Sequence, residues 1–195
     1  MAFKTLLEAF AGEEDLPVDL KAIKAWIVSQ GIQDEIEFIG VDIDEEVLRG
    51  FLHRFRETPR PYAEPTWHAH IYYERRQSVD WINMVTCKEM VHLMDGTAGM
   101  TKKEDFDTLI ERLSLPLEMK VVLEDPSFAL VDKVGDLYAA ALLLPLAARD
   151  ALMPAYRAGD LTFWDIAKLA VMPPKYARLV MSDSWEKAYA SLMKT

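Results

Sequence analysis

The sequence predicts an α+β protein that is mostly helical, with a small sheet packed against a central helix. Three observations lead to this prediction. Residues 34–41 and 66–74 have the composition and alternation of strands. Residues 79–96 are apolar around most of their circumference, which is typical of a helix buried on more than one side. The C-terminal third has helix signals one after another.

The first 60 residues are expected to form an α/β region of helix, strand and helix, within the same domain as the rest. Residues 3–10 are amphipathic, and we interpret them as a loosely attached N-terminal arm. A helix is predicted from Asp19 to Gln30, with Gly31 as its C-terminal stop. A strand is predicted over residues 34–41, where Ile36 and Phe38 alternate with glutamates.

Residues 44–57 are predicted to form a second helix. Its buried positions would be Val47, Leu48, Phe51, Leu52 and Phe55. Residues 58–65 hold three prolines and are predicted to be a loop.

The next predicted strand, residues 66–74, carries His68 and His70. Because these residues are two apart, their side chains point to the same face of a strand. That geometry suits two metal ligands, but it also suits a pair of half-buried imidazoles at packing positions. We favour the packing interpretation, because H-x-H on a strand is a common surface feature.

Residues 61–195 are expected to form a helical core that ends in helical hairpins. A capping box at Thr101–Glu104 predicts a helix to Arg112. The most apolar helix is predicted from Phe128 to Leu144, where Asp132 and Asp136 share one face. Two buried carboxylates need a counter-charge. The candidates are Lys133, Lys88, a protonated histidine or a metal.

The C-terminal third is predicted to hold four further helices. They are Leu146–Ala158 with its stop at Gly159, a helix capped by Thr162 that runs to Ala170, one from Pro173 or Pro174 to Met181, and a last one capped by Asp183 or Ser184.

Composition excludes several classes of protein. The net charge of −10 argues against a nucleic-acid surface, and the longest apolar stretch, Tyr138–Ala148, is too short to span a bilayer. The first residues lack the pattern of a secretion signal. The single cysteine, Cys87, rules out an internal disulfide and suits a reducing compartment. We therefore expect a cytoplasmic protein with one core.

The central helix carries the sequence K-E-M-V-H at residues 88–92. In zinc peptidases with H-E-x-x-H, two histidines one turn apart bind the metal, and the glutamate activates its bound water. Here Glu89 and His92 keep that spacing, whereas Lys88 replaces the first histidine. A lysine ammonium has no free lone pair for a metal. An ion-pair cluster is therefore favoured over a metal site, and Asp95 would share the face of Lys88 and His92.

Cys87 has two readings. Beside Lys88 its thiol could be activated as a nucleophile. On a helix, however, it aligns with the apolar Val91 and Met94, so we favour a buried, inert thiol.

The order of these motifs resembles a known family. After the K-E-x-x-H segment come D-K-V-G-D-L-Y-A-A-A-L-L-L-P at residues 132–145, I-A-K-L-A-V-M-P at 166–173 and A-R-L at 177–179. The order is similar to that of ImmA/IrrE-type metallopeptidases over roughly residues 66–180. There an H-E-x-x-H helix precedes E-x-x-A-N-x-F-A-x-x-L-L-M-P. The resemblance implies a zincin-like, metallopeptidase-like core, with Asp132 in the place of the acidic third ligand.

The departures from the family decide between functions. Lys88 replaces a zinc ligand, Asp132 is shorter than the usual glutamate, and Asp136 stands where the family has asparagine. We therefore expect a degenerate, non-catalytic relative with a regulatory or partner-binding role, in which Lys88 is a fixed cation that bridges Glu89 and Asp132.

Two alternatives stay open. In the first, the protein is an active zinc peptidase with Glu89 as general base, His92 and Asp132 as ligands, and a further donor from His68, His70 or Lys88. In the second, it is a structural or assembly protein of a phage or other mobile element, with residues 58–73 as a contact surface. The partner would be a protein or a peptide substrate, and no cofactor other than zinc is expected.

Overall fold

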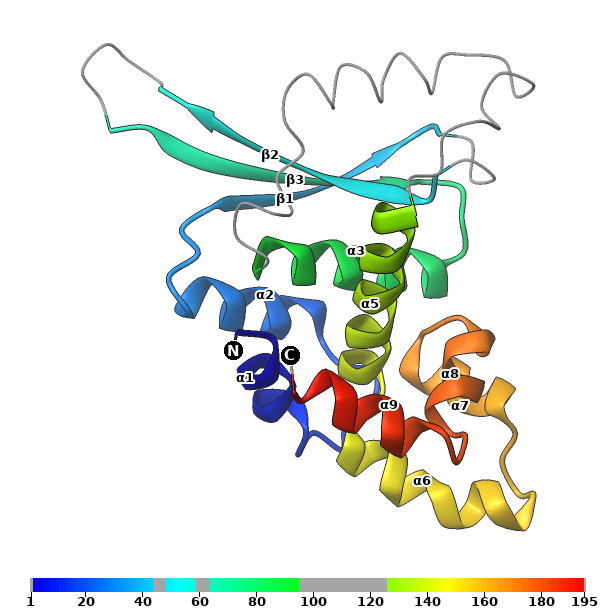
Figure 1. Cartoon of the computed structure of the whole chain (residues 1–195). Helices are drawn as coiled ribbons and strands as arrows, with labels where there is room; N and C mark the ends of the chain where they lie inside the picture. Colours follow the sequence, from blue (N-terminus) through cyan, green and yellow to red (C-terminus); the bar gives the residue numbers. More distant parts are fainter. Residues whose placement is uncertain (1, 44–47, 59–63, 95–125, 195) are drawn as a thin grey trace.

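The computed structural model describes residues 2–43, 48–58, 64–94 and 126–194, and from residue 126 onward it describes side chains starting at Lys133. The described elements form an α+β fold, as predicted (Figure 1). They are α1 (Ala2–Phe10), α2 (Leu20–Ser29), β1 (Glu35–Val41), β2 (Gly50–Glu57), β3 (Thr66–Glu74), α3 (Val79–His92), α5 (Pro126–Leu143), α6 (Leu146–Ala158), α7 (Phe163–Ala170), α8 (Pro174–Val180) and α9 (Trp185–Leu192).

The three strands form one sheet in the order β1-β3-β2. β1 runs parallel to β3, with Glu35 opposite His68, and β2 runs antiparallel to β3, with Glu57 opposite Thr66. The sheet therefore joins strands from both sides of residue 60. α3 packs against one face of this sheet, and α5 crosses α3 (Figure 1).

The helix predicted over residues 44–57 is wrong where the structure describes it. Residues 50–57 form strand β2, and Leu48 lies in no helix. The apolar positions Phe51, Leu52 and Phe55 fit helical spacing, but the same segment also alternates between two faces. Pairing with β3 along its whole length decides in favour of the strand. Residues 44–47 lie outside the described part.

The expected N-terminal arm is also corrected. In α1, Leu6 and Leu7 are fully buried, and the ring of Phe3 stacks on that of Tyr138 with 4.8 Å between centroids. The Tyr138 hydroxyl donates to the carbonyl oxygen of Leu192, 3.1 Å away. Since Tyr138 belongs to α5, the first and last described helices are both held by the same residue. The arm is an integral part of the core.

Several predicted helix ends are confirmed by their local chemistry. The Asp19 side chain accepts a hydrogen bond from the backbone N–H of Lys21, and Gly31 has a φ of +92° after α2. Thr162 and Asp165 form a capping box at the start of α7. The helix predicted from Thr101 to Arg112 lies outside the described residues.

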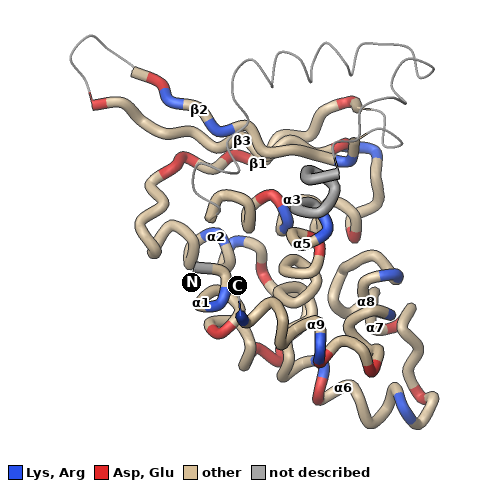
Figure 2. Tube along the Cα trace, in the orientation of Figure 1, with Lys and Arg blue, Asp and Glu red and all other residues tan. Residues whose placement is uncertain are grey.

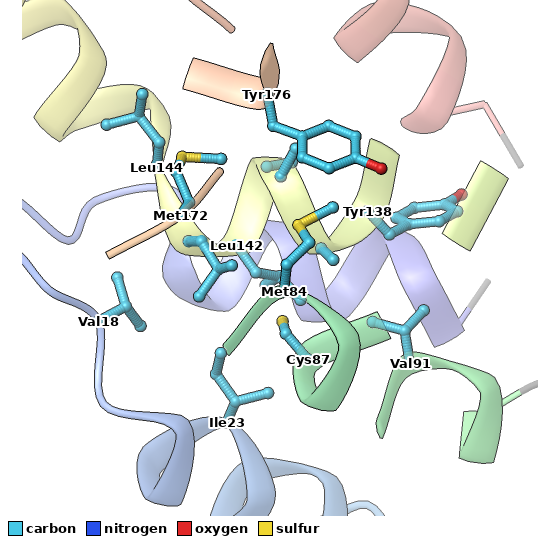
Figure 3. Close-up of a cluster of buried hydrophobic side chains, with 14 of the residues drawn as sticks. Val18, Ile23, Met84, Cys87, Val91, Tyr138, Leu142, Leu144, Met172 and Tyr176 are labelled. Carbon is cyan, nitrogen blue, oxygen red and sulfur yellow. The ribbon is translucent and has the colours of Figure 1, made fainter. Parts of the chain in front are cut away.

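Acidic residues are spread over many of the described elements (Figure 2), so the apolar core must hold the fold against this charge. The core gathers around α3 and α5, and Figure 3 shows side chains from these helices with residues from α2, α8 and the connecting segments. Cys87 is fully buried there, and burial raises the pKa of its thiol. The prediction of a buried thiol is thereby confirmed.

In the part of the chain that the structure describes, no single helix is long and apolar enough to cross a membrane. Only α5 and α6 taken together meet the length and composition of a span, and they are bent by 76° at the break between them.

Gly50 is a point of close approach between the sheet and α3. A Cβ at this position would lie 2.5 Å from the carbonyl oxygen of Tyr72 and would overlap Cγ1 of Val85. A backbone oxygen cannot move aside as the end of a flexible side chain can. The contact with Tyr72 leaves no room for a side chain between β2 and β3, and the contact with Val85 leaves none between β2 and α3.

We expect Gly50→Ala to lower the free energy of unfolding by about 1–3 kcal/mol, as overpacking does in well-packed sites. Denaturant unfolding followed by circular dichroism measures the change. Gly12→Ala is the matched control, because nothing lies within 4 Å of a Cβ at position 12. Equal stabilities of the two variants would contradict the close approach.

Glu74 is the last residue of β3 and binds the backbone of two neighbouring segments. Its side chain is 2% exposed and accepts hydrogen bonds from the backbone N–H groups of Ile43 and Arg76, the latter at 2.9 Å. Its carboxylate also accepts from Nε of Arg76 at 2.9 Å. The hydrogen bonds from Arg76 hold the pKa of Glu74 below its ordinary value of 4.5.

This depressed pKa predicts a pH dependence of stability. The stabilisation is fully present above pH 4.5, where Glu74 is ionised in both states, and it is lost as the pH falls through the lower folded-state pKa. We expect the Tm difference between wild type and Glu74→Gln to shrink between pH 7 and about pH 3. Glu186→Gln, an exposed control, should show no such trend. A Tm difference that stays constant to low pH would refute the assignment.

Candidate active site

Two polar residues of the central helix, Lys88 and Glu89, contact each other. Nζ of Lys88 is 3.1 Å from Oε1 of Glu89, and the two side chains are 12% and 7% exposed. They form a nearly buried ion pair on α3. The surrounding helix is buried around most of its circumference, with Met84, Cys87, Met90 and Val91 in the core. A charge in this place needs its partner, because an unpaired buried ion costs several kcal/mol in the usual estimates.

Gly135 brings α5 against this cluster. A Cβ at position 135 would lie 2.8 Å from Nε2 of His92 and 3.1 Å from Cγ of Lys88. The side chains of His92 and Lys88 therefore fill the space that any larger residue on α5 would need. The predicted meeting of these two helices at the K-E-x-x-H segment is found at this point.

Two predicted site residues are not fully described. Asp132 lies in α5, three residues before Gly135, but its side chain is outside the described part, as is Asp95. The structure thus brings together Lys88, Glu89 and His92. It places position 132 on the adjoining helix only at the level of the backbone.

Asp136 has a partner that the sequence analysis missed. The hydroxyl of Tyr176, on α8, donates to Oδ2 of Asp136 at 2.5 Å. Lys133, one of the proposed counter-charges, is exposed. The signal that could have found this contact is the tyrosine in P-K-Y-A-R-L. Its ring lies on the buried side of α8 with Ala177 and Val180, and a buried tyrosine hydroxyl needs a hydrogen-bond partner.

His68 and His70 do not join this site. Gly50 faces α3, so its partner Tyr73 and every second residue of β3 before it, Ala69 and Ile71 included, face α3 as well. The two histidines alternate with these residues and point to the other face of the sheet. They cannot supply the further metal ligand that the active-peptidase alternative took from them.

On that other face the histidines have glutamate neighbours. Nδ1 of His68 is 3.5 Å from a carboxylate oxygen of Glu35, and Nε2 of His70 is 3.8 Å from one of Glu37. The Phe55 ring stacks on His68 with 5.2 Å between centroids. This arrangement supports the interpretation of half-buried imidazoles at packing positions.

The side chains described around Glu89 and His92 suit the ammonium of Lys88 better than a zinc ion. Among the described residues, no group of three or more histidine, cysteine, aspartate or glutamate side chains is placed to hold a metal. At the position of the first zinc ligand stands an ammonium, and it contacts the glutamate that would activate water. Among the side chains that the structure describes, the cluster contains His92 of the proposed zinc ligands, and a catalytic zinc has three protein ligands.

Chemically, the described cluster is a fixed positive charge beside a carboxylate and an imidazole. It can hold two helices together and can present an ordered polar patch. Comparisons with known proteins add nothing to this picture: no protein-family model matches the chain, and no curated protein matches it. The function must therefore be argued from these residues.

A double-mutant cycle tests the ion pair. We expect Lys88→Met alone to lower the free energy of unfolding by about 3–5 kcal/mol, because it leaves the Glu89 carboxylate buried without its cation. The double variant Lys88→Met with Glu89→Met should cost less than Lys88→Met alone, since no charge is left in the site. Urea unfolding of wild type, Lys88→Met, Glu89→Met and the double variant gives the coupling energy. Additive effects would show that the two groups do not depend on each other.

Proposed function

We propose that this protein is a non-catalytic relative of the ImmA/IrrE-type metallopeptidases, with a zincin-like core, that acts by binding a partner protein. The observation that carries the proposal is the ion pair between Lys88 and Glu89, at 3.1 Å in a nearly buried site. Its regulatory role, its cytoplasmic setting and a link to mobile elements are part of the same proposal, and they rest on the resemblance.

The ion pair bears on the chemistry in two ways. A peptidase of this type needs a glutamate that is free to take a proton from a metal-bound water. Here an ammonium group contacts that glutamate. The ammonium supplies positive charge in the place of a metal, but it has no vacant orbital to polarise water or a peptide carbonyl.

The ligand count supports the same conclusion. His68 and His70 face away from α3, which leaves His92 and Asp132 of the carboxylate and imidazole ligands that the peptidase alternative names. Two protein ligands hold zinc poorly compared with three. The packing of Lys88 and His92 on Gly135 gives the cluster a role without any metal, because it sets the spacing of α3 and α5.

The alternative is an active metal-dependent peptidase with Glu89 as general base and His92 and Asp132 as ligands. One observation favours it. α5 passes His92 at Gly135, one turn of helix after Asp132, so the helices cross where such a site would need them.

Metal analysis of the protein, purified without chelator, separates the two functions. We expect wild type to hold far less than one zinc per chain and to leave an unfolded casein substrate uncleaved. Lys88→His should gain a divalent ion, because it completes the H-E-x-x-H pattern, and the gain should be lost in Lys88→His with His92→Ala.

Near-stoichiometric zinc in wild type that disappears in His92→Ala would overturn the proposal in favour of the peptidase. Failure of Lys88→His to gain any metal, in a variant with unchanged circular dichroism, would count against the relationship to the family.

A further inference from the structure

The helical hairpin of α7 and α8 has an outer face unlike the rest of this acidic chain. Trp164 is 57% exposed and Leu169 is 45% exposed, which makes them two of the most exposed large apolar side chains among the described residues. Beside them are the exposed side chains of Lys168, Lys175 and Arg178. Figure 2 shows basic residues on this hairpin in blue.

The two helices turn these residues outward by their own periodicity. α7 buries Ile166, Ala167 and Ala170, which places Trp164 and Lys168, one turn apart, on its opposite side. α8 buries Tyr176, Ala177 and Val180, and Lys175 and Arg178 are likewise a turn apart on its outer side. The apolar and basic groups are thus presented by rigid elements.

Ring contacts join the two helices into one surface. The Arg178 guanidinium lies 5.8 Å from the centroid of the Phe163 ring, and that ring is 5.2 Å from the ring of Trp164. At the other end of α8, Nζ of Lys175 lies 4.6 Å from the ring centroid of Trp81. We call Trp164, Phe163, Arg178, Lys175 and Trp81 the cation-aromatic strip.

The basic side chains of this hairpin outnumber its acidic ones. Within the described residues, Lys168, Lys175 and Arg178 make no ion pair, although the chain has 32 acidic residues to 22 basic ones. Asp165 is the one acid in residues 163–180. It is held by Thr162, whose hydrogen bonds lower the pKa of Asp165. The strip therefore keeps a net positive charge on a protein of net charge −10.

We propose that the cation-aromatic strip binds an acidic segment of a partner protein, with an apolar side chain of that segment packed on Trp164. The inference rests on the proposed partner-binding function and names the chemistry of the partner. Exposed tryptophan and arginine are the side chains that contribute most at protein interfaces.

Fluorescence anisotropy with a labelled peptide tests the proposal on the full chain. The probe is a peptide of Glu-Glu-Leu repeats, and its matched control has Gln-Gln-Leu repeats. We expect the Glu peptide to bind at least tenfold more tightly, and its affinity to fall as salt is raised. Lys175→Glu with Arg178→Glu should weaken this binding at least tenfold, and Trp164→Ala should weaken it several-fold.

Lys21→Glu with Lys187→Glu is the matched control variant, because it changes net charge equally at exposed positions on α2 and α9. It should bind within about twofold of wild type. All the changed side chains are exposed, so circular dichroism and Tm should be preserved in each variant.

Four results would overturn the proposal: no binding of the Glu peptide, equal loss of affinity in both charge-reversal variants, tighter binding of a DNA duplex, or self-association of wild type that the strip variant abolishes. None of these four results depends on the ion pair between Lys88 and Glu89. If the metal analysis reveals a zinc peptidase instead, the proposed function fails while the anisotropy result still stands on its own.

Discussion

The close approach of α3 and α5 at Gly135 is the constraint on which the rest of the structure depends. Lys88 and His92 occupy the space beside this glycine, and the sheet covers another side of α3 through the contact at Gly50. A helix enclosed in this way cannot send its charges to water. Lys88 and Glu89 must therefore satisfy each other, and their pairing is a consequence of packing before it is a feature of any site.

The same packing ties the buried cluster to the surface of α8. Asp136 follows Gly135 and accepts from the Tyr176 hydroxyl, and the Tyr176 ring meets Trp81 edge-on with 6.0 Å between centroids. Lys175 lies over both of these rings. One buried tyrosine thus links the interhelical site and the cation-aromatic strip through direct contacts.

The sequence was a good guide where the decisive physics is local. Asp19, Gly31 and Thr162 mark helix ends because capping and left-handed backbone are properties of a few adjacent residues. It failed at residues 50–57, since the apolar spacing there fits both a helix and a strand, and only pairing with β3 distinguishes them. The partner of Asp136 was missed for a related reason, because Tyr176 is 40 residues away in the chain.

The site was predicted in its residues but not in its geometry. Spacing alone groups Lys88, Glu89 and His92 on one helix, whereas the face of β3 that carries His68 and His70 depends on which side of the sheet α3 covers. That choice removes two imidazoles from the cluster. The buried Glu89 carboxylate needs a positive charge nearby. The ammonium of Lys88, on the same helix, supplies this charge without further ligands. A metal in that place would need three protein donors. In the relationship that we propose, a lysine in the place of a zinc ligand keeps the packing of α3 and α5 without a metal, and for this reason we propose a binding function.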